Sequence, residues 1–318
     1  MKIKKAIALL LCAALMLLCM GGCGTEKKNN GRKHIVATIF PEYDWVNKLI
    51  TMPDHFDITL LLSNGVDMHS YQPSVDDIMT ISSCDMFIYV GGESDAWVKD
   101  ALAQATNKDM IVISLMDILG DKAKEEETVS GMQAEHEDGD EKEYDEHVWM
   151  SLENTELFCD KITDGLIKLG EDEKDCRGRC ETLKEKLEKL RGEYKAAVDA
   201  SDKKTIIVGD RFPFRYLTDE FGIEYYAAFA GCSAETDASF ETIVFLADKA
   251  DEIGAKAIIQ TENPVGRVAE TIRDNTKSKD QQIVTLDSMQ SVSLKDIEEG
   301  VSYLSIMQRN LEELKKAL

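Results

Sequence analysis

Two of the five histidines lie where a chain can present a metal ligand. His69 lies in a polar loop after an apolar segment, and His147 lies just before a predicted helix. A neutral imidazole is the commonest metal ligand in proteins. The other three, His34, His55 and His136, lie in polar surroundings, where we expect solvated side chains. His69 and His147 are therefore the first candidate metal ligands.

Three carboxylates follow apolar segments in the second half of the chain. They are Asp210, Glu262 and Asp287. Two of them have a simpler interpretation when taken alone: Asp287 as a helix cap, and Asp210 as the partner of Arg211 or Arg215. Two imidazoles with one or two carboxylates form a reasonable ligand set for zinc or manganese. We favour zinc, because imidazole binds zinc more tightly than manganese, and keep manganese as the alternative because oxygen ligands suit it.

Alternating strands and helices must position these residues. Buried strands are predicted at 35–39, 57–62, 86–90, 111–114, 205–208, 257–260 and 283–286. Segments with helical periodicity separate them, including a final helix at 294–318 and one long amphipathic helix at 171–201. This order predicts α/β architecture with mostly parallel sheets flanked by helices. We place an N-terminal lobe at 34–170 and a C-terminal lobe at 202–318. Loops after parallel strands line a ligand crevice, which is where the candidate ligands lie.

The first 22 residues have the pattern of a signal peptide. Three lysines precede the apolar stretch 6–20, which is too short to span a bilayer stably. Small residues then precede Cys23, as in lipoprotein processing. The alternative is an ordinary signal peptide with an incidental cysteine. We predict an acylated Cys23, a polar tether at 23–33, and attachment by lipid to the outer face of the cytoplasmic membrane.

The charge of the chain is strongly negative. The formal net charge is −23, and loss of three lysines with the signal peptide makes it −26. Such a chain lacks the basic surface that nucleic acid requires. The segment 121–146 is so acidic and so poor in apolar residues that we predict a disordered surface loop.

Five cysteines remain beyond Cys23, and an odd number does not form a complete disulfide framework. They are Cys84, Cys159, Cys176, Cys180 and Cys232. Cys176 and Cys180 lie four residues apart on a predicted helix. A local disulfide or a metal pair is conceivable there, but we expect two solvent-facing thiols without a function.

Motifs of common enzymes are missing. We find no dinucleotide-binding or phosphate-binding glycine loop and no His-Glu-x-x-His helix. The segment Gly231-Cys232-Ser233-Ala234-Glu235 departs from the nucleophile elbow at its last position. We therefore predict a binding protein rather than an enzyme.

Several stretches together resemble one family, the zinc- and manganese-binding receptors of bacterial ABC importers (cluster A-I solute-binding lipoproteins). They are Phe40-Pro41, His69-Ser70-Tyr71-Gln72-Pro73, Gly91-Gly92-Glu93-Ser94-Asp95-Ala96-Trp97, His147-Val148-Trp149-Met150-Ser151, Phe212-Pro213-Phe214-Arg215-Tyr216-Leu217, Glu262, Leu286-Asp287-Ser288 and Val301-Ser302-Tyr303-Leu304. The resemblance implies two lobes bridged by a rigid long helix. It also implies one metal ion held between the lobes and delivered to a membrane permease driven by an ATPase. We expect the protein to be a monomer.

The resemblance also implies a ligand set. The first two family histidines correspond to His69 and His147, and the late aspartate corresponds to Asp287. The third family ligand, a histidine or glutamate, falls on Gly209, which has no side chain to offer. Asp210 is then the expected replacement, with Glu262 in reserve.

Two other classes remain open at this point. A metal-dependent hydrolase needs an open coordination position and a general base, which Glu262 could supply. A surface adhesin would use the metal structurally. An ion that fills a crevice between two lobes favours the importer receptor.

Overall fold

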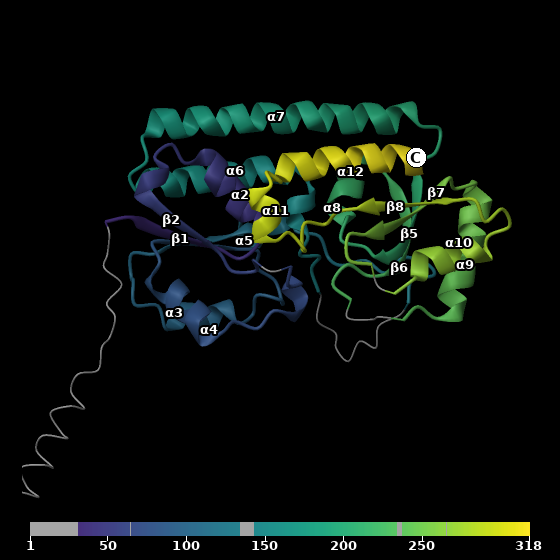
Figure 1. Ribbon diagram of the computed structural model, residues 1–318, viewed down its shortest axis with the longest axis horizontal. Helices are drawn as coiled ribbons and strands as arrows, with labels where there is room; N and C mark the ends of the chain where they lie inside the picture. The colour runs from purple at the N-terminus through teal and green to yellow at the C-terminus, as the bar shows by residue number, and fades with distance from the viewer. Residues whose placement is uncertain (1–30, 64, 134–142, 234–236, 265) are drawn as a thin grey trace, which may run out of the picture. The chain divides into compact units, whose positions relative to one another are not determined.

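Two parallel four-stranded sheets form the framework of the protein (Figure 1). The computed structural model describes residues 31–63, 65–133, 143–233, 237–264 and 266–318. The first sheet has the order β2-β1-β3-β4, with β1 (Lys33–Ala37), β2 (Phe56–Leu60), β3 (Met86–Tyr89) and β4 (Ile111–Ser114). The second has the order β6-β5-β7-β8, with β5 (Thr205–Arg211), β6 (Glu224–Phe229), β7 (Ala257–Thr261) and β8 (Gln282–Leu286). The predicted fold class is confirmed.

Helices follow the strands in both lobes. The first lobe contains α2 (Phe40–Leu49), α3 (Val75–Ser83), α4 (Val98–Ala103), α5 (Leu115–Leu119) and α6 (Leu152–Lys168). The second contains α8 (Arg215–Phe221), α9 (Phe240–Ile253), α10 (Val268–Asn275), α11 (Leu294–Glu298) and α12 (Tyr303–Ala317). Short 3₁₀ turns lie at η1 (Pro53–His55), η2 (Met68–Ser70), η3 (Gly120–Lys122) and η4 (Val148–Met150). Local sequence sets their starts: Ser74 and Asp77 form a capping box before α3.

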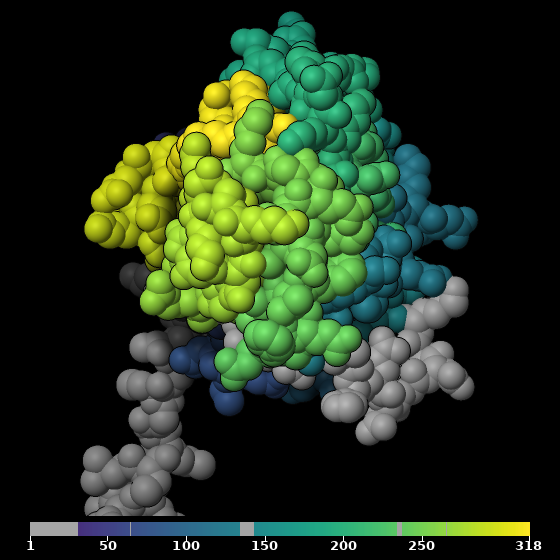
Figure 2. Space-filling model, turned by 90° about the vertical axis from the view of Figure 1, so that its right-hand side faces the viewer, coloured from purple at the N-terminus to yellow at the C-terminus, as the bar shows by residue number. Residues whose placement is uncertain are grey.

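The 28-residue helix α7 (Glu173–Ala200) packs against both lobes. Leu183, Leu187, Leu190 and Tyr194 lie three or four residues apart and are all buried, as an amphipathic helix requires. It packs on α2 and α6 in the first lobe and on α8 and α12 in the second. Figure 2 looks onto the second lobe and shows α12, in yellow, beside α7, in teal. The predicted long helix is thus confirmed.

None of the helices in the described residues has the length and apolar content that crossing a membrane requires. The predicted signal peptide and Cys23 lie outside those residues and remain predictions. Cys176 and Cys180 are free thiols but buried, which corrects the expectation of solvent-facing side chains. They pack on the apolar face of α7, where cysteine behaves as a small hydrophobic residue.

Two segments differ from the prediction in secondary structure. Strand β6 was not predicted, although its tyrosines and phenylalanine favour strand. The predicted helix 294–318 is instead α11 and α12, separated at Gly300, whose φ of 92° is left-handed and ends the first helix. Ser302 then caps α12 through its side chain.

The prediction of a disordered loop at 121–146 is wrong for its described ends, while 134–142 lie outside the described residues. Glu126 N donates to the carbonyl of Glu143, and Gln133 N donates to the carbonyl of Ala228 in β6. Asp145 and Glu146 are each only 2% exposed. Acidic composition misled the prediction because these carboxylates accept internal hydrogen bonds instead of facing solvent.

The tight packing around Gly209 allows us to predict the effect of adding one methyl group within β5. A Cβ at this position would lie 2.5 Å from Ala269 Cα in α10, closer than backbone atoms tolerate. We expect Gly209→Ala to lower the free energy of unfolding by about 1–3 kcal/mol through overpacking. Gly192 in α7 is the matched control, because a Cβ there meets nothing within 4 Å. Gly192→Ala should raise stability by about 0.5–1 kcal/mol. Urea unfolding of both variants tests this, and equal stability of Gly209→Ala and wild type would contradict the packing argument.

The buried carboxyl group of Glu42 should make the stability of the folded protein depend on pH. Its Oε2 accepts hydrogen bonds from Thr38 N and Oγ1. Burial, then the charge of Asp95, raises the pKa of Glu42 from 4.5 to about 8. The folded state therefore holds this proton while the unfolded chain releases it, so stability is lost as pH rises from 4.5 through 8. Glu42→Gln should flatten this slope in urea unfolding, and exposed Glu241→Gln should leave it unchanged. A Glu42→Gln variant with the wild-type slope would show that Glu42 is not the group responsible.

Candidate metal centre

His69 is positioned by the loop after β2. It lies in η2, and its backbone N donates to the carboxylate of Asp67, which caps the turn. The His69 Nδ1 atom is 2.9 Å from Ser94 Oγ and 3.4 Å from Glu146 Oε2. The Ser94 hydroxyl can donate or accept, but the Glu146 carboxylate can only accept, so we assign the imidazole proton to Nδ1. The Nε2 lone pair is then available to a cation.

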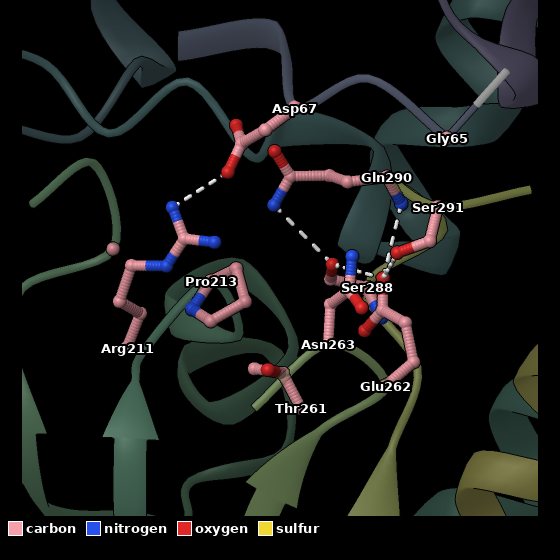
Figure 3. Close-up of a pocket in the computed structure, with 11 residues that line it drawn as sticks. Gly65, Asp67, Arg211, Pro213, Thr261, Glu262, Asn263, Ser288, Gln290 and Ser291 are labelled. Atoms are coloured by element: carbon pink, nitrogen blue, oxygen red, sulfur yellow. Dashed lines mark hydrogen bonds and ion pairs between the residues drawn. The ribbon is translucent and has the colours of Figure 1, made fainter. Parts of the chain in front are cut away.

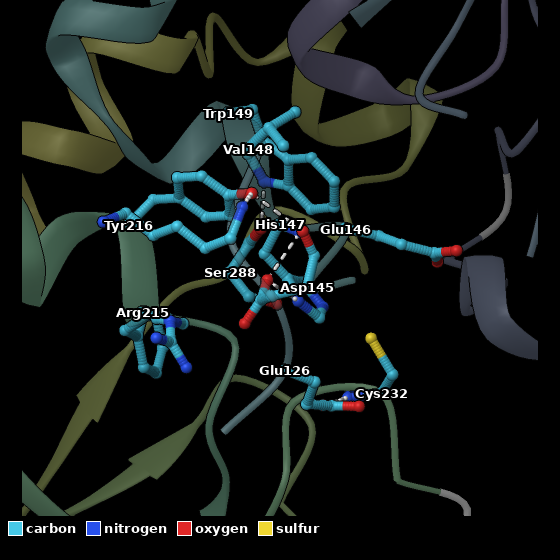
Figure 4. Close-up of polar contacts among 12 residues, drawn as sticks. Glu126, Asp145, Glu146, His147, Val148, Trp149, Arg215, Tyr216, Cys232 and Ser288 are labelled. Carbon is cyan, nitrogen blue, oxygen red and sulfur yellow. Dashed lines mark hydrogen bonds and ion pairs between the residues drawn. The ribbon is translucent and has the colours of Figure 1, made fainter. Parts of the chain in front are cut away.

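His147 is completely buried and is held by the residue two positions before it (Figure 4). Asp145 Oδ1 accepts from both the backbone N of His147, at 2.8 Å, and Nδ1, at 3.0 Å. Burial opposes protonation of this ring, but the carboxylates of Asp145, Glu146 and Glu126, with Asp145 contributing most, together raise the pKa of His147. A carboxylate on Nδ1 is the usual support of a metal-binding histidine, since it directs Nε2 outward and increases its basicity.

The two Nε2 atoms face one another at 3.2 Å. Since Nδ1 carries the proton in both rings, two lone pairs point at the same space and repel unless a proton or a metal ion lies between them. Tetrahedral zinc with ordinary zinc–nitrogen bonds requires two nitrogens about 3.3 Å apart. The observed separation therefore fits two ligands of one zinc ion.

The second lobe contributes a thiol to the same place. Among the described residues, His69, His147 and Cys232 form a group whose potential ligand atoms all lie within 4.8 Å of one another. Cys232 lies after β6, and its backbone N donates to Glu126 Oε1 at 2.9 Å. At Gly231 an added Cβ would lie 2.8 Å from the Phe212 carbonyl and 3.2 Å from the His147 ring, so glycine permits this approach. Burial, then Asp145 and Glu126, raises the pKa of the Cys232 thiol well above its usual value.

A small pocket between the lobes adjoins these three residues (Figure 3). Asp67 of the first lobe and Arg211 of the second form an ion pair across it, with Nη1 and Oδ2 2.6 Å apart. Gln290 also lines it and places Nε2 3.4 Å from His147 Nε2. A second pocket, lined mostly by apolar side chains, lies beside Trp149 and Met68. Both lobes therefore meet around the histidine pair.

The sequence profile described as "Zinc-uptake complex component A periplasmic" matches residues 35–317. The chain belongs to this family. The predicted resemblance to metal receptors of importers is thereby confirmed, and the family is a transport component rather than a class of enzymes.

Relatives agree with this assignment, and a solved structure has the same fold. The zinc-binding lipoprotein AdcA of Streptococcus pneumoniae is 28% identical over 316 residues, covering 98% of this chain and 61% of AdcA. The high-affinity zinc uptake system protein ZnuA of Bacillus subtilis is 26% identical, covering 99% of this chain and 98% of that protein. The crystal structure of the metal-dependent lipoprotein YcdH from Bacillus subtilis has a TM-score of 0.73 at 23% identity, with 90% and 99% coverage. The chain spans only 56–61% of the length of its AdcA relatives.

The structure brings the two predicted histidines of this zinc-uptake family member together, but it places the three predicted carboxylates in other networks. Asp210 accepts from Thr261 N and Oγ1 through one oxygen and from Arg211 N through the other. Arg211 therefore meets Asp210 through its backbone, while its side chain pairs with Asp67. Gly209 lies against α10 and leaves no room for a ligating side chain.

Glu262 and Asp287 are likewise directed to protein donors. Glu262 accepts from Ser288 N at 2.8 Å and from Gln290 N at 3.2 Å. Asp287 accepts from Met289 N and lies 3.5 Å from Arg309. Burial, then the charge of Glu262, raises the pKa of Asp287 to about 6. Neither belongs to the group formed by His69, His147 and Cys232.

Cys232 is the residue that sequence reasoning missed. It follows β6, so recognising that strand would have placed the thiol at the carboxyl end of a parallel strand, like the other candidates. Glu146 and Asp145 were also missed as supports of the histidines, because they belong to the segment predicted as disordered.

The contact between Asp145 and His147 leads to a prediction that can be tested in metal-free protein. Because its carboxylate raises the pKa of His147, Asp145→Asn should lower that pKa. Titration of the imidazole by NMR in metal-free protein measures the change. Exposed Asp202→Asn serves as the control and should leave the His147 titration unchanged. An unchanged pKa in Asp145→Asn would show that another group supports this ring.

Proposed function

We propose that this protein captures a divalent transition metal, zinc in preference to manganese, between its two lobes and delivers it to an ABC importer. The observation that carries the proposal is the pair of Nε2 atoms 3.2 Å apart, each supported through Nδ1. The family and the two zinc-uptake relatives support zinc as the cargo. We retain 34–170 and 202–318 as the proposed lobes, with 171–201 as the connection between them.

The choice of zinc has a chemical basis. Imidazole ligands bind zinc more tightly than manganese in the Irving–Williams order. Carboxylates would shift the site towards manganese, but Asp210, Glu262 and Asp287 are bound to protein donors in this structure. The ligands gathered at the site therefore favour zinc.

The cellular setting follows from the same family. Its description as a periplasmic uptake component supports a location outside the cytoplasm and an ABC transporter as partner. We propose attachment to the outer face of the membrane through a lipid on Cys23, with a permease and its cytoplasmic ATPase receiving the metal from a monomer. Retention on a membrane needs more than one acyl chain, as a lipoprotein provides.

A binding role is supported over hydrolysis by the position of Glu262. A hydrolase needs a general base within reach of a metal-bound water. Glu262 accepts backbone hydrogen bonds from the 288–290 turn, so its carboxylate stabilises that turn.

The decisive test is zinc binding by His69→Ala. Zinc should stabilise the wild type by about 4 kcal/mol at a thousandfold excess over its dissociation constant. His69→Ala should remove most of this gain, because it deletes one of two imidazole ligands. Calorimetric titration and thermal unfolding with and without zinc measure both effects.

The matched control for this test is His55→Ala, an exposed histidine in η1. It should bind zinc like the wild type. Wild-type protein that shows no zinc-dependent stabilisation, or His69→Ala that retains all of it, would refute the proposed function.

A further inference from the structure

We propose that Cys232 supplies a thiolate ligand from the second lobe to the ion held by His69 and His147, forming a nitrogen–sulfur site selective for thiophilic metals. This inference rests on the proposed function, since the ion is the one the protein carries. It assigns to the second lobe a ligand type different from the carboxylates expected from the sequence.

The first support is position. The potential ligand atoms of all three residues lie within 4.8 Å of one another. Figure 4 shows the Cys232 side chain reaching from its loop towards the part of the site occupied by His147. In tetrahedral zinc, sulfur and nitrogen ligands lie about 3.6 Å apart. A shift of about one ångström at most therefore completes the geometry.

The second support is the way the surrounding chain holds Cys232. Its backbone N is bound to Glu126 Oε1 of the first lobe's acidic segment. The preceding Gly231 lies against the His147 ring, where a larger residue would push the loop away. Cys232 is a free cysteine, so its sulfur is not committed to a disulfide. The chain is thus held in place at Gly231 and at the backbone of Cys232, directly beside the thiol.

The third support comes from the competing side chains of the second lobe. The carboxylates of Asp210, Glu262 and Asp287 already accept hydrogen bonds from protein donors. Cys232 is the second-lobe member of the group around the histidines within the described residues. Without Cys232 both ligands would come from the first lobe, whereas a thiolate lets the ion join the two lobes.

Ligation exchanges a proton for the metal ion. The S–H bond of Cys232 breaks, the proton leaves to solvent, and a sulfur lone pair forms the bond to Zn²⁺. A thiolate is a soft ligand that favours zinc and disfavours manganese. The structure thus points to sulfur, in addition to imidazole, as the source of metal selectivity.

Cobalt substitution tests the sulfur bond directly. Co²⁺ replaces zinc in tetrahedral sites, and a cobalt–thiolate bond produces an intense near-ultraviolet charge-transfer band. Wild-type protein loaded with Co²⁺ should show this band, and Cys232→Ser should lose it. Cys180→Ser removes another free thiol, on α7, and should keep the band. Circular dichroism of the metal-free variants checks that each is folded.

Competition titration measures the consequence for selectivity. Cys232→Ser should weaken zinc binding by more than about tenfold and reduce the preference for zinc over manganese by a similar factor. If the wild type binds zinc but shows no charge-transfer band, or if Cys232→Ser keeps wild-type zinc affinity, the thiolate proposal is wrong and the receptor proposal stands. If the wild type binds no zinc at all, the proposed function itself fails, and the thiolate proposal fails with it.

Discussion

Two imidazole lone pairs that face one another at 3.2 Å are the constraint around which this structure is organised. Both rings are oriented through Nδ1, by Asp145 for His147 and by Ser94 with Glu146 for His69. Neutral imidazoles in that arrangement repel, and a cation relieves the repulsion. The acidic residues next to His147 in sequence therefore serve the site from inside the protein. They help to form a site in which the facing imidazoles repel each other when no cation is present and are stabilised when one is bound.

The long helix α7 determines which parts of the two lobes meet. It packs on α2 and α6 in one lobe and on α8 and α12 in the other, so loops from both sheets converge on the histidines. Further polar contacts cross between the lobes beside the site. Trp149 Nε1 donates to the Ser288 carbonyl, and Arg211 pairs with Asp67, whose other oxygen caps the turn that carries His69. Asp67 thereby links the turn that carries His69 to the second lobe.

A nitrogen–sulfur site explains how a very acidic protein can discriminate among cations. Its net charge attracts every cation and so contributes no selectivity between zinc and manganese. Selectivity must come from atoms that touch the ion. Imidazole nitrogens and the Cys232 sulfur favour zinc, while the nearby carboxylates, which would favour manganese, are engaged by backbone donors. The negative charge of the chain thus attracts cations in general, and the atoms that contact the ion select zinc over manganese.

The sequence by itself determined the α/β class, the long helix, the family resemblance and the two histidines, because periodicity and ordered local motifs survive without tertiary information. It could not decide which second-lobe side chain approaches the histidines. Asp210 lies near the end of β5, and Glu262, Asp287 and Cys232 follow strands. Hydrogen bonds from residues distant in sequence, Thr261 to Asp210 and Ser288 to Glu262, direct two of the carboxylates elsewhere, and the nearby Met289 N binds the third, Asp287. Only the folded chain brings Gly231 against His147 and places the thiol beside the imidazoles. The burial of Asp145 and Glu146 could not be predicted for the same reason. An acidic composition does not show which hydrogen-bond donors the fold will bring to each carboxylate.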